Sequence, residues 1–201
     1  MVTSAAEAAP VRQTGPVEDD TRFEGGSWEH ILEVYRSATD AQVAAGRSWY
    51  PEALKIGTDL HAQGPAILAV LSPSTEWGVN VQAARDVVSS GWSKWQSGTN
   101  KHKAIKIIGG ADPDDIARGN KVRAFWRAIK GDTESVTVDR HALSVFLGYQ
   151  VSGKQAGVLS RKGAYAFVEA AYHKVAKIIG ISPRDLQAIT WVAWREQHGL
   201  N

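Results

Sequence analysis

A lysine and an aspartate 18 residues apart, Lys121 and Asp139, form the pair with the most definite chemistry in this chain. Lys121 lies at the start of an amphipathic segment, and Asp139 precedes a second apolar segment. An amine nucleophile with a nearby carboxylate is the minimum equipment for cleaving a glycosidic bond through a covalent imine. The pair therefore predicts this chemistry, on the condition that the fold brings both side chains into one cleft.

Both residues also have ordinary structural explanations. A lysine on a helix surface commonly only keeps its charge in water. An aspartate at a helix start accepts hydrogen bonds from backbone amides as an N-cap. Capping and catalysis are compatible for Asp139, because a rigid carboxylate that faces a cleft also stabilises positive charge in a transition state. His141 suits general acid or base chemistry, but we favour a structural role for a lone histidine near a helix start.

Hydrophobic periodicity predicts the elements that carry this pair. Apolar residues from Val122 to Ile129 recur at helical spacing. Lys121 lies at the border of their apolar side, so its side chain is expected to be partly buried and partly exposed to solvent. Residues 136–138 read as an extended segment, and Asp139 follows them at the N-cap position of the next helix.

The remaining pattern is helix after helix with few strand signals. We expect helices from Trp28, through the apolar residues 66–71, from Trp77 to Gly91, over 165–179 and from Ser182 onward. A turn near Gly46 and a new helix after Pro51 are expected between the first two. Residues 148–163 read as a mobile connection. The sequence thus predicts an all-α protein with a disordered tail over residues 1–25 and a single domain over residues 26–201.

Composition excludes several classes of protein. Hydrophobic residues make up 43% and charged residues 22% of the 201 residues, and no apolar run approaches the roughly 20 residues that span a bilayer. We therefore expect no membrane partner. No cysteine occurs, which excludes disulfides, thiolate metal sites and a cysteine nucleophile. The six histidines share no ligand spacing, so we expect neither a metal nor another cofactor.

Charge and aromatic residues are unevenly distributed. The net charge is only +2, but between Lys94 and Lys130 nine basic residues accompany three acidic ones. Such a patch suits a phosphate backbone, and a solvated helical face with a lysine-rich loop explains it equally well. Of the eight tryptophans, Trp92 and Trp95 lie beside this patch, where an aromatic ring is able to stack on an unpaired base. The other six are expected mostly in the core.

From Ala66 to Leu147 the sequence resembles the helix-hairpin-helix DNA glycosylases, the endonuclease III type in particular. Residues 67–72 read Ile-Leu-Ala-Val-Leu-Ser and precede Pro-Ser-Thr, similar to a buried family helix and its DNA-facing turn. Gly119-Asn120-Lys121 resembles the end of the family's hairpin with its catalytic lysine, and Val138-Asp139-Arg140-His141 resembles the Val-Asp-Thr-His motif with its catalytic aspartate. Residues 116–120 retain one glycine of the usual Leu-Pro-Gly-Val-Gly turn, so the expected hairpin is degenerate.

This resemblance implies an all-α fold of two lobes, double-stranded DNA as partner, and extrusion of a normal or modified base into the cleft between the lobes. It implies Lys121 as the imine-forming nucleophile of an N-glycosylase or lyase, a hydrolase, assisted by Asp139. The residues that it places against DNA are Ser72, Ser74, Thr75, Arg118, Gly119, Asn120, Arg123, Arg127, Arg140 and His141. The chain also resembles small proteins of actinobacterial phages. Because its first residues lack a secretory signal, we expect it in the cytoplasm, that of a bacterial host for a phage protein.

Three functions stay open at this point. The first is an enzyme that excises or exchanges a base through Lys121 and Asp139. The second is a DNA-binding protein on the same fold without catalysis. The third is a phage accessory protein that binds a host protein through a tryptophan-rich surface.

Overall fold

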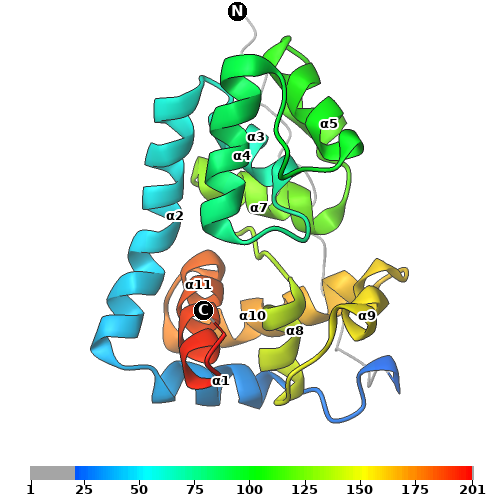
Figure 1. Ribbon diagram of the computed structural model, residues 1–201. Coiled ribbons are helices and arrows are strands. Elements are labelled where there is room, and N and C mark those ends of the chain that lie inside the picture. Colours follow the sequence, from blue (N-terminus) through cyan, green and yellow to red (C-terminus); the bar gives the residue numbers. More distant parts are fainter. Residues whose placement is uncertain (1–20, 201) are drawn as a thin grey trace, which may run out of the picture.

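The computed structural model describes residues 21–200, which form helices, turns and loops without a β-strand. The prediction of an all-α protein is confirmed. Figure 1 shows two groups of helices, one above the other. The upper group contains α3 (Gly64–Leu71), α4 (Trp77–Ser90), α5 (Gly98–Ile108), α6 (Pro113–Ile116) and α7 (Asn120–Lys130). The lower group contains η1 (Thr21–Phe23), α1 (Trp28–Ser37), α8 (Arg140–Leu147), α9 (Gly153–Ala156), η2 (Gly157–Ser160), α10 (Ala164–Ile179) and α11 (Pro183–Gln197).

Each group packs around its own hydrophobic core. In the upper group, all eight residues of α3 are buried, as expected for a helix that is apolar on every side. Residues of α5 and α7 such as Ile107 and Ile129 pack against it. In the lower group, Phe146 of α8 and Tyr172 of α10 belong to a separate cluster of buried residues. The described residues, 21–200, therefore form two hydrophobic cores, and the region between the two groups of helices is a boundary between these cores.

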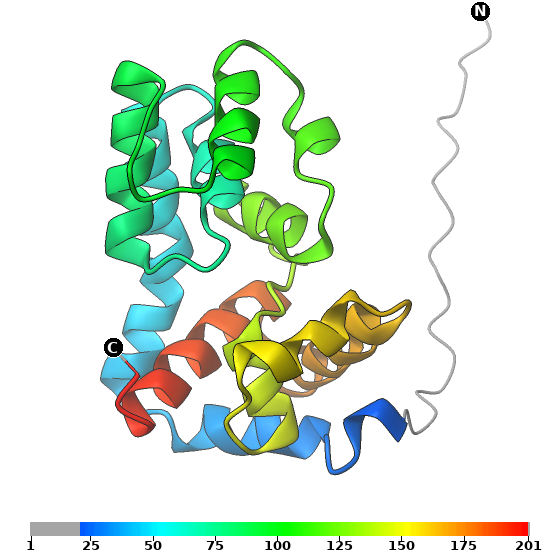
Figure 2. The ribbon, with the colours of Figure 1, turned by 45° about the vertical axis from the view of Figure 1, so that its right-hand side comes forward.

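The long helix α2 (Asp40–Leu60) connects the two groups and packs along α11 and α3 (Figures 1 and 2). The expected turn at Gly46 and the new helix after Pro51 are wrong, because both residues lie inside α2. A Cβ added to Gly46 would lie 2.5 Å from the Cα of Ile189, so this glycine permits close packing against α11. Pro51 forgoes one backbone hydrogen bond, and burial of Tyr50 and Ala53 on either side of it offsets that loss.

A short hairpin precedes Lys121. The side chain of Asp112 accepts a hydrogen bond from the backbone of Asp114 and so caps the four-residue helix α6. Residues 117–119 then connect α6 to α7, with Gly119 at the N-cap of α7 and no side chain capping it. The start of α7 thus leaves backbone N–H groups without a side-chain partner at the position where Lys121 emerges.

The structure differs from expectation in two less regular segments, the N-terminal tail and residues 148–163. The first 20 residues of the predicted tail lie outside the described residues, but Phe23 is 4% exposed and its ring stacks on Phe167 at 5.4 Å. Packing therefore begins before residue 26. The expected mobile connection, residues 148–163, contains α9 and η2 together with the buried side chain of Val151. Among residues 21–200, no helix is both long and apolar enough to cross a membrane.

A candidate active site between the two groups of helices

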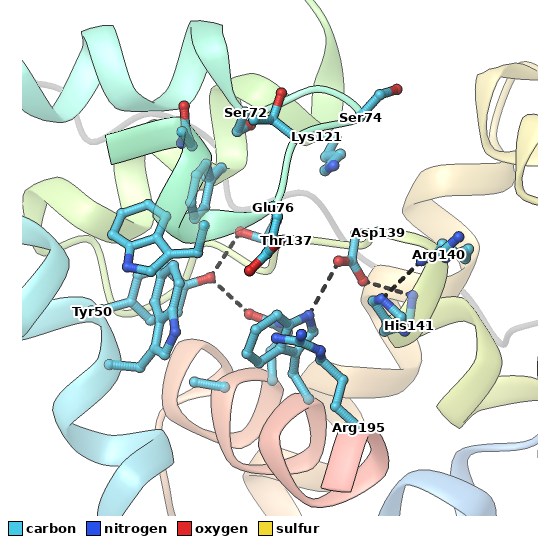
Figure 3. Close-up of a pocket in the computed structure, with 18 of the residues that line it drawn as sticks. Tyr50, Ser72, Ser74, Glu76, Lys121, Thr137, Asp139, Arg140, His141 and Arg195 are labelled. Carbon is cyan, nitrogen blue, oxygen red and sulfur yellow. Dashed lines mark hydrogen bonds between the residues drawn. The ribbon is translucent and has the colours of Figure 1, made fainter. Parts of the chain in front are cut away.

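A cavity of about 620 Å³ lies where the two groups of helices meet (Figure 3). Its lining comes from both of them: the α3–α4 loop and α7 from the upper group, and α8 and α11 from the lower group. Its volume falls within the range of about 300–1,000 Å³ that is usual for ligand sites. The cavity is therefore large enough to take a small organic molecule or one nucleotide.

Lys121 and Asp139 both line this cavity. Lys121 is the second residue of α7 and is half-buried, with Phe125 one turn further along the same wall. Its position at the border of the apolar side agrees with the expectation from periodicity. The amine and the carboxylate thus belong to one site although they come from different groups of helices.

Three N–H donors hold the Asp139 carboxylate. Its Oδ1 accepts hydrogen bonds from the backbone N–H groups of His141 and Ala142, each at 2.8 Å, as the N-cap of α8. Its Oδ2 accepts a hydrogen bond from the indole Nε1 of Trp191 on α11 at 3.2 Å. The predicted N-cap is confirmed, and the bond to Trp191 additionally aims the carboxylate toward the cavity.

The extended segment between the two residues is also held in place. The Tyr50 hydroxyl lies 2.9 Å from Thr137 Oγ1 and donates to Gln187 Oε1 at 2.7 Å (Figure 3). Tyr165 donates to the Val136 carbonyl and accepts from the Val138 N–H. Burial raises the pKa of both Tyr50 and Tyr165 well above the usual value, so both remain neutral hydroxyls at pH 7.

Aromatic rings form one wall of the cavity. The ring of Trp49 lies 5.0 Å from that of Trp77, 5.7 Å from Phe125 and 5.8 Å from Trp191, centroid to centroid. All four residues line the cavity, and the three tryptophans are only half-buried. The expectation of core tryptophans is confirmed for Trp126 and Trp194, and Trp49 and Trp77 pack against the upper core as well as lining the cavity. Helical spacing does not distinguish a side chain that faces a core from one that also faces a cavity. Such a wall suits a flat ring that stacks.

His141 lies half-buried at the edge of the cavity. Burial lowers the pKa of His141 below its usual 6.5, and the positive charges of Arg140, Arg195 and Lys121 lower it further, while the Asp139 carboxylate opposes the shift. The imidazole is therefore neutral at pH 7. In this form it is able to accept a proton from a substrate or from water.

The residues predicted to contact DNA fall into two sets. Ser72, Ser74, Thr75, Arg140 and His141 line the cavity together with Lys121 and Asp139. The remaining five, Arg118, Gly119, Asn120, Arg123 and Arg127, lie outside the cavity on the α6–α7 hairpin and α7.

The arginines of this second set make local contacts to the α6 region. Arg127 Nη2 forms an ion pair with Asp114 Oδ1 at 3.0 Å, and Arg123 Nη2 donates to the Asp114 carbonyl at 3.4 Å. Arg118 Nε donates to the Asp115 carbonyl at 2.7 Å. The ion pair and the two hydrogen bonds occupy three of the cationic side chains of the basic patch between Lys94 and Lys130.

Trp92 and Trp95 lie away from the cavity. They are 59% and 49% exposed, as expected from their place beside the basic loop. A lysine amine lies over each ring face, Lys101 at 5.1 Å from the Trp92 centroid and Lys94 at 4.5 Å from the Trp95 centroid. These two rings are surface features and take no part in the candidate site.

Sequence reasoning missed several residues of the site. Glu76, Asn80, Gln187 and Arg195 all line the cavity, yet none of them was proposed as a site residue from the sequence. One weak signal exists for the first two, since Glu76 and Asn80 are four residues apart and so share a face of α4. Within residues 21–200, the structure brings together no group of three or more histidines, aspartates or glutamates that would hold a metal ion.

Comparison with known proteins adds a family but no activity. The model of one protein family, described as a family of unknown function (DUF7178), matches residues 20–198. No curated protein and no solved structure matches the chain.

Proposed function

The chain belongs to the DUF7178 family, and we propose that it is a DNA glycosylase-like protein that excises or exchanges a base through Lys121 and Asp139. One observation supports this above all others: the two residues, 18 positions apart in sequence, line the same cavity from opposite groups of helices. In this proposal the two groups are the lobes of a helix-hairpin-helix glycosylase-like fold, and α6 and α7 form its degenerate hairpin.

The lining of the cavity fits each requirement of the reaction. The wall formed by Trp49, Trp77 and Trp191 offers faces on which an extruded base stacks. Arg140 and Arg195 carry positive charge around it, suited to the phosphates that flank an extruded nucleotide. The substrate is accordingly double-stranded DNA, and one nucleotide at a time enters the site.

In the proposed reaction, the Lys121 Nζ attacks C1′ of the extruded nucleotide as a free amine. The glycosidic bond breaks, and the base leaves with the bonding electron pair and takes up the proton that the attacking amine loses. The Asp139 carboxylate stabilises the positive charge that develops on C1′ and the ring oxygen. The C1′–O4′ bond then breaks, O4′ takes up a proton from water, and an iminium ion between Lys121 and C1′ remains. Attack by water on C1′ releases the sugar as an aldehyde and Lys121 as an amine, whereas attack by a different base, with closure of the ring through O4′, releases Lys121 and gives exchange.

Borohydride trapping tests this proposal, because hydride reduces the iminium ion to a stable secondary amine. We expect wild-type protein to form a covalent complex with at least one member of a panel of duplexes containing normal and modified bases. Lys121→Ala should abolish the complex. Lys130→Ala, an exposed lysine at the other end of α7, is the matched control and should leave it unchanged.

The outcomes separate the alternative functions. A covalent complex that persists in Lys121→Ala would refute the assignment of the nucleophile. Salt-dependent DNA binding with no covalent complex on any duplex would instead indicate a DNA-binding protein without this chemistry. Absence of DNA binding at low salt would favour a protein that binds a host protein.

A further inference from the structure

Asn80 leaves an unpaired acceptor in the wall of the cavity. The side chain comes from α4, is 1% exposed and contributes to the cavity lining. Its Oδ1 accepts no hydrogen bond from any residue in the described part of the chain. The oxygen itself is almost fully covered, so a bound molecule reaches it only when the groups around it shift. A buried acceptor without a donor is destabilising, and a donor on the bound molecule would relieve this.

The hydrogen bond of the Asn80 amide nitrogen determines the orientation of the amide. Its Nδ2 donates to the Leu68 carbonyl at 3.0 Å. That carbonyl lies in the last turn of α3, and the Ser72 N–H, which would continue the helix by donating to it, donates to Ala69 instead. If the amide were turned around, Oδ1 would face the carbonyl oxygen and two acceptors would repel. The free atom is therefore the oxygen, and it requires a donor.

A second acceptor stands one helical turn earlier on the same face. Glu76 is the N-cap residue of α4, its side chain makes no capping hydrogen bond, and it lines the cavity. Figure 3 shows its side chain pointing into the cavity. The nearby hydroxyls of Tyr50 and Thr137 are already hydrogen bonded to each other. Helix α4 therefore presents two oxygen acceptors to a bound molecule.

We propose that the base taken into this cavity carries an exocyclic amino group that donates to Asn80 Oδ1. This inference rests on the proposed function of the same cavity. An amino group has two hydrogens and is able to serve Asn80 and Glu76 together. Thymine and uracil offer one ring N–H flanked by two carbonyl oxygens, which these acceptors repel. The substrate class is thus the bases with an exocyclic amino group, cytosine, adenine and guanine, as opposed to thymine and uracil.

Titration calorimetry with three matched pairs of nucleosides tests the inference. The pairs are 2′-deoxycytidine and its analogue without the 4-amino group, 2′-deoxyadenosine and purine 2′-deoxyriboside, and 2′-deoxyguanosine and 2′-deoxyinosine. For wild-type protein, the amino member of at least one pair should bind about tenfold more tightly or better. In Asn80→Leu, which has a similar volume and no acceptor, the affinity for the amino member should fall toward that of its partner, with Glu76 keeping part of the difference, and the partner's affinity should stay unchanged.

A second variant covers the case in which Asn80→Leu fails to fold. Glu76→Gln changes an exposed position without a capping bond, and it should reduce the preference for the amino member by weakening one of the two acceptors. Equal binding of both members by wild-type protein, no binding of either, or an unchanged preference in the folded variants would overturn the inference.

The same titration distinguishes this inference from the proposed reaction. Nucleoside binding requires neither DNA nor an amine nucleophile, so the preference and the trapping are independent measurements on the wild-type protein. A preference for amino-bearing nucleosides without borohydride trapping would leave the inference intact and refute the reaction. Trapping without the preference would refute the inference alone.

Discussion

Asp139 is more tightly held than an ordinary N-cap residue. Two backbone N–H groups of α8 bind one oxygen of its carboxylate, and the Trp191 indole binds the other. A group held from both sides loses little freedom when charge develops beside it, and this is the property that a stabilising carboxylate needs. Capping and catalysis therefore use the same rigid geometry.

Replacement of Asp139 separates these two roles. Asp139→Asn keeps one side-chain oxygen for the two backbone N–H groups, but its amide NH2 faces the Trp191 N–H and loses that hydrogen bond, so its free energy of unfolding should fall by about 0.5–1.5 kcal/mol. Asp139→Ala should lose about 0.5–2 kcal/mol, as is usual for a removed N-cap. Both variants remove the negative charge, and the rate of borohydride trapping should fall on the order of 100-fold in each.

Urea denaturation measures the stability part of this prediction, and single-turnover trapping measures the rate. Wild-type trapping by a well-folded Asp139→Asn would show that the carboxylate only caps α8.

At the level of single residues, the sequence predicted the pair and some of its cavity neighbours, such as Ser72 and His141, but not all of its surroundings. Periodicity placed Lys121 at the border of its helix and Asp139 at an N-cap, because both inferences need only neighbouring residues. Trp191 and Asn80 reach the cavity from helices whose packing angles no local pattern encodes. Only the packing of α4 and α11 in the structure therefore shows that these two residues line the cavity.

At the level of elements, α2 shows where local rules fail. Gly46 and Pro51 both signal a break in a helix, yet α2 runs through both from Asp40 to Leu60. The contact with α11 explains this, since Gly46 lies against the backbone of Ile189. Tertiary packing therefore determined that α2 continues through both residues. Local signals were sufficient for the ends of three other helices, since α4, α7 and α10 end at Gly91, Gly131 and Gly180.

Two glycine substitutions test this account of α2. In Gly46→Ala, the new Cβ would lie 2.5 Å from the Cα of Ile189, so α2 and α11 must separate. We expect a loss of about 1–3 kcal/mol in the free energy of unfolding. Gly78→Ala is the matched control, because it also lies in a helix and its Cβ would meet nothing within 4 Å; it should gain about 0.5–1 kcal/mol.

Urea denaturation of both variants gives the comparison. Equal stability of Gly46→Ala and Gly78→Ala would contradict the close approach of α2 to α11.

At the level of the whole molecule, the site lies between two separate cores. Composition and periodicity predicted an all-α chain, and helix count and order followed largely from the apolar repeats. The arrangement of the two groups around a cavity did not follow from these repeats. It depends on the length of α2 and on the extended residues 136–138, and side chains distant in sequence hold both segments in place. Tyr50, Tyr165 and Tyr172 are the buried groups that hold these parts together through Thr137, Val136 and Ala142.

These tyrosines predict sensitivity to alkaline pH. Burial raises the pKa of Tyr50, Tyr165 and Tyr172 above the usual 10.0. Above about pH 10 the unfolded chain loses these phenol protons while the folded chain retains them, so the unfolded state binds fewer protons and stability falls as pH rises. Below that pH these three residues contribute no pH dependence.

Parallel measurement of tyrosinate absorbance and far-ultraviolet circular dichroism checks this. The absorbance of about three tyrosines should appear together with the loss of helix. Tyr172→Phe should make the decline in stability with pH shallower. Complete titration of all five tyrosines while helicity persists would refute the burial of these hydroxyls.

The most direct test of the central claim is to locate the trapped adduct on the chain. After borohydride reduction with a reactive duplex, digestion with nuclease and trypsin should leave the peptide Gly119–Arg123 uncut and heavier by the reduced sugar, because trypsin does not cleave after a modified Lys121. Mass spectrometry that finds the adduct on this peptide would support imine chemistry at Lys121. An adduct on any other lysine, or none from any duplex in the panel, would contradict it.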